Sequence, residues 1–190
     1  PLTEFHTKAA AGENLMRMTE SVRRYERRDC FGSIKKFLEL PNEPRICVIY
    51  GLRRTGKTTM LFQTIQDMTA EDFSKTVYIK IETDDTMAGL NKDLQLLYDS
   101  GIRNVFIDEI TLMSDFIDSS SLLSDVYAAV GMKIILSGTD SLGFWLAKNQ
   151  ELYDRAYSIH TTFIPFREYS RLLKKDDIDA FISALEDILK

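Results

Sequence analysis

The sequence predicts an α/β fold in which a doubly wound, mainly parallel sheet of five strands carries helices on both faces. From residue 44 onward, short apolar runs alternate with segments of helical periodicity, as expected of a parallel sheet that is covered on both sides. The chain has 190 residues, of which 44% are hydrophobic, and this suits one such domain with small additions. Right-handed crossovers would then place a ligand site at the carboxyl ends of the strands.

Five apolar runs are the candidate strands, and segments with helical spacing lie between them. The strands are expected at residues 46–50, 76–81, 104–108, 133–137 and 157–164. The helices are expected at residues 57–68, 90–100, 115–130 and 141–148. Together these elements define a core domain at residues 44–165.

Helical additions are expected at both ends of this core. Residues 1–43 form an N-terminal helical segment with two short helices between positions 14 and 40. Its basic residues are Arg23, Arg24, Arg27 and Arg28. They suit a solvated helix face, while contacts with nucleotide, a neighbouring subunit or nucleic acid stay open. Residues 166–190 form a C-terminal helical extension whose apolar stripe packs on the core, meets a partner or begins a further domain.

Charge, cysteine content and hydropathy narrow the classes of partner. The net charge of -5 and the pI of about 5.2 leave nucleic acid an unsupported partner. Cys30 and Cys47 show no metal-ligand spacing. No apolar stretch approaches the roughly 20 residues of a membrane span, and the first residues lack the pattern of a secretion signal. We therefore expect a soluble, cytoplasmic protein with no membrane contact.

A phosphate-binding loop is predicted where the first core strand gives way to a helix. The pattern G-x-x-x-x-G-K-T, or Walker A motif, is formed by Gly51, Leu52, Arg53, Arg54, Thr55, Gly56, Lys57 and Thr58. The two glycines allow backbone N–H groups to approach phosphates, and the following helix adds the positive end of its dipole. Lys57 is expected to bridge the β- and γ-phosphates, Thr58 to bind Mg²⁺ and Thr59 to lie near the α-phosphate.

Two carboxylates follow the apolar strand at residues 104–108 and complete this prediction as a Walker B motif. Asp108 is expected to hold the magnesium ion, directly or through water, and Glu109 to act as general base on the attacking water. At the end of the next strand, Ser137 is the first candidate for a γ-phosphate sensor and Thr139 the second. A helix N-cap is the competing interpretation of the hydroxyls there. The guanine-specific N-K-x-D motif is missing, so ATP is the expected nucleotide.

These motifs resemble those of the AAA-type P-loop ATP-binding proteins of archaea and bacteria, in the additional-strand, catalytic-glutamate division of P-loop ATPases. The resemblance covers about residues 45–172 and includes the sensor-like residues 137–139 and the signature at residues 165–169, Pro-Phe-Arg-Glu-Tyr. It implies an AAA-type core. The family's Gly-Arg pair corresponds here to Asp154-Arg155, which makes Arg155 a candidate for charge stabilisation at the γ-phosphate, in cis or from a neighbouring subunit. An exposed structural arginine is the alternative. Glu168, with Arg167, is interpreted as a helix-start residue.

The leading functional hypothesis is Mg²⁺-dependent hydrolysis of ATP, coupled to conformational change of a partner or an appended domain. Partners left open are a homo-oligomer and an appended C-terminal domain. One alternative is a nucleotide-gated interaction module in which weak hydrolysis only times association with a partner or with DNA. A small-molecule kinase is a third class, disfavoured because Glu109 directly follows Asp108 and no arginine-rich lid segment is found.

Overall fold

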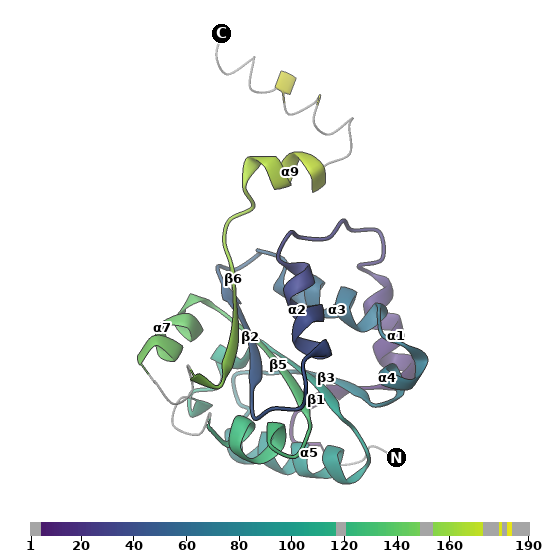
Figure 1. Cartoon of the computed structure of the whole chain (residues 1–190), viewed down its shortest axis with the longest axis vertical. Coiled ribbons are helices and arrows are strands. Elements are labelled where there is room, and N and C mark those ends of the chain that lie inside the picture. The colour runs from purple at the N-terminus through teal and green to yellow at the C-terminus, as the bar shows by residue number, and fades with distance from the viewer. Residues whose placement is uncertain (1–4, 117–120, 149–153, 173–178, 180–181, 184–190) are drawn as a thin grey trace.

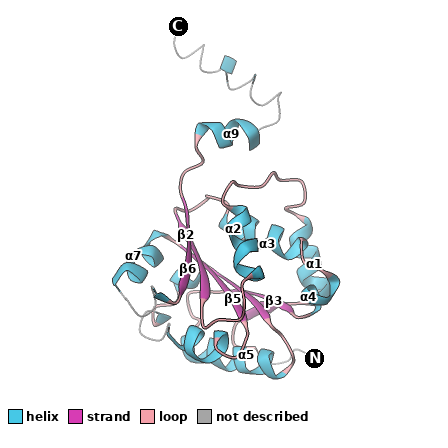
Figure 2. Ribbon diagram, viewed as in Figure 1, coloured by secondary structure: helices cyan, strands magenta, loops and turns pink. Residues whose placement is uncertain are grey.

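Six strands form one sheet in the order β1-β3-β4-β5-β2-β6, and helices cover both of its faces (Figures 1 and 2). The computed structural model describes residues 5–116, 121–148, 154–172, 179 and 182–183. The strands are β1 (Lys8–Ala10), β2 (Ile46–Gly51), β3 (Thr76–Lys80), β4 (Asn104–Asp108), β5 (Lys133–Gly138) and β6 (Ala156–Thr161). All neighbours in the sheet run parallel except β1, which is antiparallel to β3. The predicted α/β class is therefore confirmed.

The sheet has one strand more than the five that were predicted. The additional strand, β1, belongs to the N-terminal segment that was expected to be helical. Asp93, on α5 (Met87–Asp99), holds the chain just before it: the amide of His6 donates to Oδ1 at 2.9 Å, and the amide of Thr7 to Oδ2 at 2.7 Å. Three residues are too few to show an alternating pattern, so β1 has no sequence signal of its own.

The last strand ends earlier than predicted, at Thr161 rather than residue 164. Its neighbour in the sheet is β2, where Gly51 pairs with Thr161 and is the last residue of the strand. Residues beyond Thr161 thus have no strand to bond with. The chain leaves the sheet there and leads to α9 (Figure 1).

The alternation of side chains along the strands builds two apolar layers. One layer contains Ile46 and Val48 of β2 and packs against α5 and the segment after β4. The other contains Cys47 and Ile49 and packs against α1, α2 and α3. The helices are α1 (Gly12–Glu20), α2 (Phe31–Glu39), α3 (Lys57–Gln66), α4 (Ala70–Ser74), α5, α7 (Asp140–Lys148) and α9 (Phe166–Leu172). Since both faces of the sheet are buried, the doubly wound arrangement follows.

One predicted helix needs revision. The helix expected at 115–130 contains a π-helical segment, η2 (Leu123–Ala128), and is preceded by a short 3-10 turn, η1 (Ile110–Leu112); residues 117–120 of that prediction lie outside the described residues. Of the C-terminal helical extension expected at residues 166–190, the structure describes residues 166–172, 179, 182 and 183, and the rest lies outside the described residues. Among the parts of the chain that the structure describes, no helix has the length and apolar character to cross a membrane.

The contact between α7 and β2 depends on a glycine. Gly143 of α7 lies against the ring of Tyr50, which stacks on His160 with ring centroids 4.8 Å apart. A Cβ atom at position 143 would collide with the Tyr50 ring. We therefore expect Gly143→Ala to lower the free energy of unfolding by about 1–3 kcal/mol, as overpacking usually does, in urea unfolding followed by circular dichroism.

Gly32 offers a matched control because it is also helical, in α2, and an added Cβ would meet nothing within 4 Å. Gly32→Ala should leave stability unchanged or raise it by up to about 1 kcal/mol, through helix propensity alone. Equal stability of the two variants would contradict the proposed contact.

Candidate active site

The phosphate-binding loop joins β2 to α3 at the carboxyl edge of the sheet. Gly56 precedes α3 with a φ of 85°, a conformation that glycine adopts at little cost. At Gly51 a side chain would collide with the backbone oxygen of Thr161 on β6, so close strand packing also requires glycine there. Arg54, between them, has a φ of 65°, which is uncommon for a residue with a side chain. Such conformations cluster at functional sites.

Lys57 begins α3 and bends back over the loop. Its Nζ donates hydrogen bonds to the carbonyl oxygens of Gly51 at 2.9 Å and Leu52 at 2.7 Å. Burial lowers the pKa of Lys57, and the neighbouring carboxylates of Glu109 and Asp108 oppose this effect. The amine is therefore held at the mouth of the loop by acceptors that an anionic phosphate can replace.

Asp108, at the end of β4, is the most densely hydrogen-bonded side chain of the site. Oδ2 accepts from Thr58 Oγ1 at 2.7 Å and from the Tyr78 hydroxyl at 2.8 Å. Oδ1 accepts from the Glu109 amide at 3.1 Å and, through a short hydrogen bond, from Ser137 Oγ. The carboxylate is almost fully buried, at 2% exposure, so these donors replace the water that burial removes.

Tyr78 has no role in the sequence-based predictions. It lies on β3, where it pairs with Phe106 of β4, two residues before Asp108. Burial raises the pKa of the Tyr78 hydroxyl, and the adjacent carboxylate of Asp108 raises it further, so the hydroxyl keeps its proton and acts as a donor. A tyrosine in an apolar strand ordinarily indicates packing, and only the alignment of β3 with β4 reveals this contact.

Glu109 follows Asp108 with a φ of 63°, the second residue with a side chain in the left-handed region among those described. Its amide also lies 3.2 Å from Ser137 Oγ, so the turn is fixed from β5. This turn directs the chain out of the sheet, and the Glu109 side chain lines a cavity above the loop. A conformation costing about 1–3 kcal/mol is thus maintained at the position predicted to act on water.

Hydroxyl groups from two segments meet at the end of β5. Thr139 donates its amide to Thr111 Oγ1 at 3.3 Å, and its own hydroxyl lies 2.7 Å from Ser141 Oγ. Ser137 is buried and contacts both Asp108 and Glu109. Ser137 thus lies within the carboxylate network, whereas Thr139 lies among the hydroxyls that begin α7.

A cavity of about 580 Å³ brings most of the predicted residues together, within the usual size range of small-molecule sites. Its lining residues are Arg53, Arg54, Gly56, Lys57, Thr58, Thr59, Glu109, Ser137, Gly138 and Thr139. A neighbouring cavity of about 220 Å³ shares Arg54, Gly56 and Thr59 with it and extends to Tyr25 and Ile164. The sequence had not indicated these last two residues as part of a site.

Arg155 is not brought to this cavity. It immediately precedes β6, and its carbonyl accepts from the amide of Ile46 at the beginning of β2, while the loop follows the end of β2. From Ala156 to Thr161 the strand spans roughly 17 Å, at about 3.3 Å per residue. The Arg155 side chain is 41% exposed, and its guanidinium forms an ion pair with Asp125. Of the roles left open for Arg155, a contact with the γ-phosphate of the same chain has no support from this arrangement, because Arg155 lies at the amino end of β6 and the loop follows the carboxyl end of β2.

The basic cluster of the N-terminal segment is divided between different environments. Arg24 is exposed, and Arg27 pairs with Asp67 at 2.5 Å on the protein surface. Arg28 is buried at 8% exposure and pairs with Glu168 of α9, so its interpretation as a solvated residue is wrong. These arginines lie in or beside the connection between α1 and α2 rather than on one helix face.

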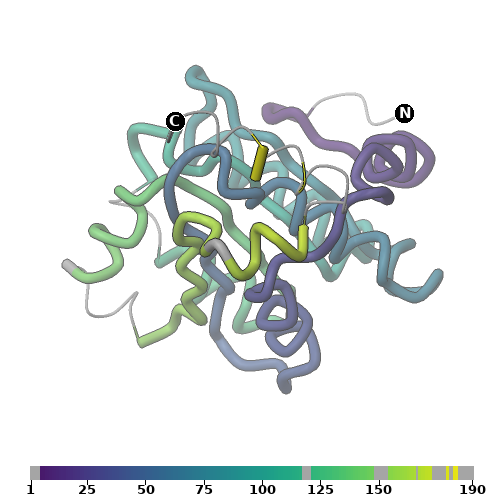
Figure 3. Tube along the Cα trace, turned by 90° about the horizontal axis from the view of Figure 1, so that it is seen from above, coloured from purple at the N-terminus to yellow at the C-terminus, as the bar shows by residue number. Residues whose placement is uncertain are grey.

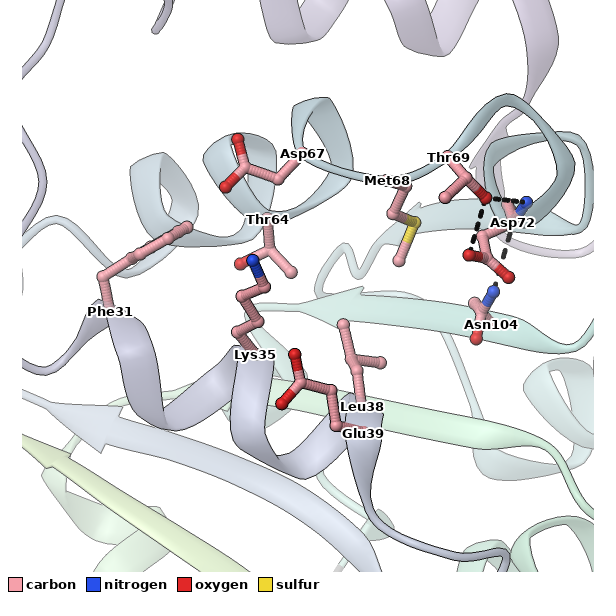
Figure 4. Close-up of a pocket in the computed structure, with 10 residues that line it drawn as sticks. All are labelled: Phe31, Lys35, Leu38, Glu39, Thr64, Asp67, Met68, Thr69, Asp72 and Asn104. Atoms are coloured by element: carbon pink, nitrogen blue, oxygen red, sulfur yellow. Dashed lines mark hydrogen bonds between the residues drawn. The ribbon is translucent and has the colours of Figure 1, made fainter.

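A further cavity of about 340 Å³ lies at the other end of α3, next to the start of β4 (Figure 4). Several of its polar groups bond to one another: Thr69 Oγ1 donates to Asp72 Oδ2 at 2.7 Å and caps the amide of Asp72 at 3.1 Å. This cavity is lined by Asn104, the first residue of β4, whereas Asp108 is its last residue. The cavity therefore lies at the amino ends of the strands, opposite to the phosphate loop. It is separate from the predicted active site.

Comparison with known proteins gives the family. An AAA domain model matches residues 43–170. An uncharacterised protein of Methanocaldococcus jannaschii, MJ1544, is 31% identical over 137 residues, which are 68% of this chain and 29% of that protein. The chain thus spans less than a third of the length of this relative. A solved structure of C. elegans PCH-2 is similar with a TM-score of 0.43 and 15% identity, over 85% of this chain and 45% of that one. The match over residues 43–170, most of the chain, shows that the protein belongs to the AAA domain family of P-loop ATPases.

Proposed function

We propose that the chain binds ATP with Mg²⁺ in the 580 Å³ cavity, hydrolyses it, and couples hydrolysis to a conformational change of a partner or an appended domain. The observation that carries this proposal is the convergence of Lys57, Thr58 and Glu109 on one cavity. β5 lies between the strand of the loop and the strand of Asp108, which supports the finer assignment to the additional-strand, catalytic-glutamate division.

The residues present fit a magnesium ion. Thr58 Oγ1 and Asp108 Oδ2 are 2.7 Å apart, and hydroxyl and carboxylate oxygens are the donors that Mg²⁺ prefers beside phosphates. Thr58 would hold the ion directly, and Asp108 would do so directly or through water. When bound, the ion would neutralise charge on the β- and γ-phosphates.

The remaining roles follow from position. Lys57 would exchange its carbonyl partners for phosphate oxygens and counter their charge. Glu109 would take a proton from the attacking water as the bond from water oxygen to γ-phosphorus forms and the bond to the bridging oxygen breaks, leaving ADP and phosphate. Ser137 would hold the Asp108 carboxylate and the Glu109 backbone in position through its hydrogen bonds to both. The nucleoside would lie in the 220 Å³ cavity, which Thr59 connects to the phosphate end.

The general-base role is tested by Glu109→Gln beside Lys57→Ala. We expect Glu109→Gln to keep its affinity for ATP and to lower kcat about 100- to 10,000-fold, the usual contribution of a general base. Lys57→Ala should instead weaken ATP binding by roughly 10- to 150-fold, because a charged hydrogen bond is lost. Phosphate release and binding of a fluorescent ATP analogue measure the two effects. Unchanged turnover in Glu109→Gln would refute the base.

The support that Tyr78 gives to Asp108 predicts an effect on magnesium. Tyr78→Phe removes one donor from Oδ2 and keeps the ring, so the Mg²⁺ concentration for half-maximal hydrolysis should rise roughly 10-fold. Tyr127→Phe is the matched control, since that buried hydroxyl bonds to the carbonyl of Asn91 at 2.8 Å, away from the site. An identical Mg²⁺ requirement in both variants and the wild type would show that Tyr78 acts only in packing.

We assign to Arg155 the role of stabilising charge at the γ-phosphate of a neighbouring copy of the chain. The phosphate loop of its own chain lies at the carboxyl ends of the strands, whereas Arg155 lies at the amino end. Arg155→Ala should then lower kcat by roughly 1,000-fold or more. Mixed with Glu109→Gln, it should recover activity above the sum of the two, because some contacts then join an intact Glu109 site to an intact Arg155. A mixture that only adds the separate activities would leave Arg155 as the ion-pair partner of Asp125.

A further inference from the structure

Arg28 connects the phosphate loop to the C-terminal helix. Its Nη1 donates to the carbonyl oxygen of Thr55 at 2.6 Å. On the other side, Nε and Nη2 donate to Glu168 Oε1 and Oε2 at 2.5 and 3.3 Å. Arg28 and Glu168 are 8% and 5% exposed, so the two charges are paired where water hardly reaches them. A bidentate ion pair of this kind fixes the orientation of the guanidinium as well as its position.

Thr55 is the point at which the loop is held from behind. Its hydroxyl donates to the carbonyl of Leu52 at 2.9 Å and lies 2.8 Å from Thr161 Oγ1, while its carbonyl receives Arg28. The residue is 4% exposed; like Arg28 it lines the 220 Å³ cavity proposed for the nucleoside, but neither residue lines the 580 Å³ cavity proposed for the phosphates. These contacts act on the loop without occupying the space in which phosphates would bind.

The peptide between Thr55 and Gly56 transmits the effect of the Arg28 contact to the 580 Å³ cavity. The carbonyl of Thr55 and the N–H of Gly56 belong to one planar trans peptide, so they point in opposite directions. When Arg28 holds the oxygen behind the loop, the N–H of Gly56 is directed away from Arg28, and Gly56 lines the phosphate cavity. A cation at the oxygen also polarises the peptide and makes its N–H a stronger donor to an anion.

The other end of the connection is α9, which lies above the loop joining α1 and α2 (Figures 1 and 3). Glu168 Oε1 also accepts from the amide of Asp29 at 2.9 Å. Arg171, one turn further along α9, donates to the carbonyl of Arg27 at 2.7 Å and to Asp29 Oδ1 at 2.8 Å. The start of the C-terminal extension is therefore attached to the segment that holds the phosphate loop.

This attachment persists at neutral pH. Burial by itself raises the pKa of the Glu168 carboxyl, but the hydrogen bonds from Arg28 and from the amide of Asp29 outweigh it and hold the pKa below its ordinary value. The stability contributed by the pair is present above the ordinary carboxyl pKa and is lost as the pH falls through the lowered one.

We propose that Arg28 is a positioning residue for the phosphate loop, and that through Glu168 it makes the docking of α9 respond to nucleotide in the loop. The inference rests on the ATP binding proposed above. An anion at the N–H of Gly56 strengthens the carbonyl of Thr55 as an acceptor for Arg28, which tightens the contact shared with α9. Linkage requires the reverse effect as well, so a docked α9 raises the affinity of the loop for nucleotide.

The first test measures α9 directly, by hydrogen exchange of residues 166–172 in the full chain with Mg²⁺ and a non-hydrolysable ATP analogue. We expect the analogue to slow exchange several-fold in the wild type and to have no effect on α9 in Glu168→Gln. Arg167→Gln is the matched control, because Arg167 is exposed on the same helix, and it should behave as the wild type. Exchange in α9 that ignores bound analogue in the wild type would overturn the inference.

The second test separates positioning from stability. Arg28→Gln and Glu168→Gln should weaken binding of the same analogue about 10-fold or more, and Arg23→Gln, at an exposed position of the same segment, should not. The double variant Arg28→Met/Glu168→Leu removes both buried charges and should recover thermal stability. We expect its affinity for the analogue to stay low, since nothing then holds the carbonyl of Thr55. Recovery of affinity together with stability would show a merely structural role.

The two proposals fail in different ways. If the wild-type chain does not bind the analogue, the proposed function is wrong and this inference is wrong with it. If the wild type binds it and Arg28→Gln and Glu168→Gln bind it equally well, the function stands and only the role of Arg28 is refuted.

Discussion

The site depends on one buried carboxylate, that of Asp108, on which separate parts of the fold converge. Thr58 reaches it from α3, Tyr78 from β3 and Ser137 from β5, and the amide of Glu109 completes the set. A buried charge without partners would be strongly unfavourable, so its burial requires β3, β4 and β5 to stay aligned at their carboxyl ends. The same demand fixes the start of α3 beside the sheet. The acid is thus both the predicted metal-side group and a constraint on the architecture that presents it.

A second constraint acts on the loop from the side that faces away from the phosphate cavity of about 580 Å³. Backbone N–H groups can serve an anion only if their peptides are oriented before it arrives. Glycine permits that orientation but does not enforce it, because glycine is equally at ease in others. Enforcement comes from Thr55, whose hydroxyl is tied to Leu52 and Thr161 and whose carbonyl is held by Arg28. The flexible residues of the loop are therefore flanked by one that is strongly restrained.

The sequence predicted the five parallel strands and the loop because their signals are local: apolar runs of strand length, and glycine and lysine at fixed spacing. What it missed depends on contacts distant in the chain. The chain just before β1 is held by Asp93, more than 80 residues away. The contact of the Tyr78 hydroxyl with Asp108 depends on the register of β3 with β4. Arg28 resembled a solvated arginine because Glu168, 140 residues further on, has no spacing relation to it. The roles of Arg155 stayed open in the sequence because a local motif does not say at which end of the strands the residue will lie.

The connection between α1 and α2 meets the start of α9 beside the phosphate loop, and this bears on how the proposed hydrolysis would move a partner or an appended domain. The strands around Asp108 are buried on both faces, so a change at the phosphates cannot readily move them. The contacts described between α9 and the segment of residues 27–29 are hydrogen bonds and ion pairs, which exchange with water at little net cost when they are exposed. A movement that begins at the phosphate loop would therefore displace α9 rather than the strands of the sheet. The buried pair of Arg28 and Glu168 is the one strong link in that set, so it determines whether α9 follows the loop.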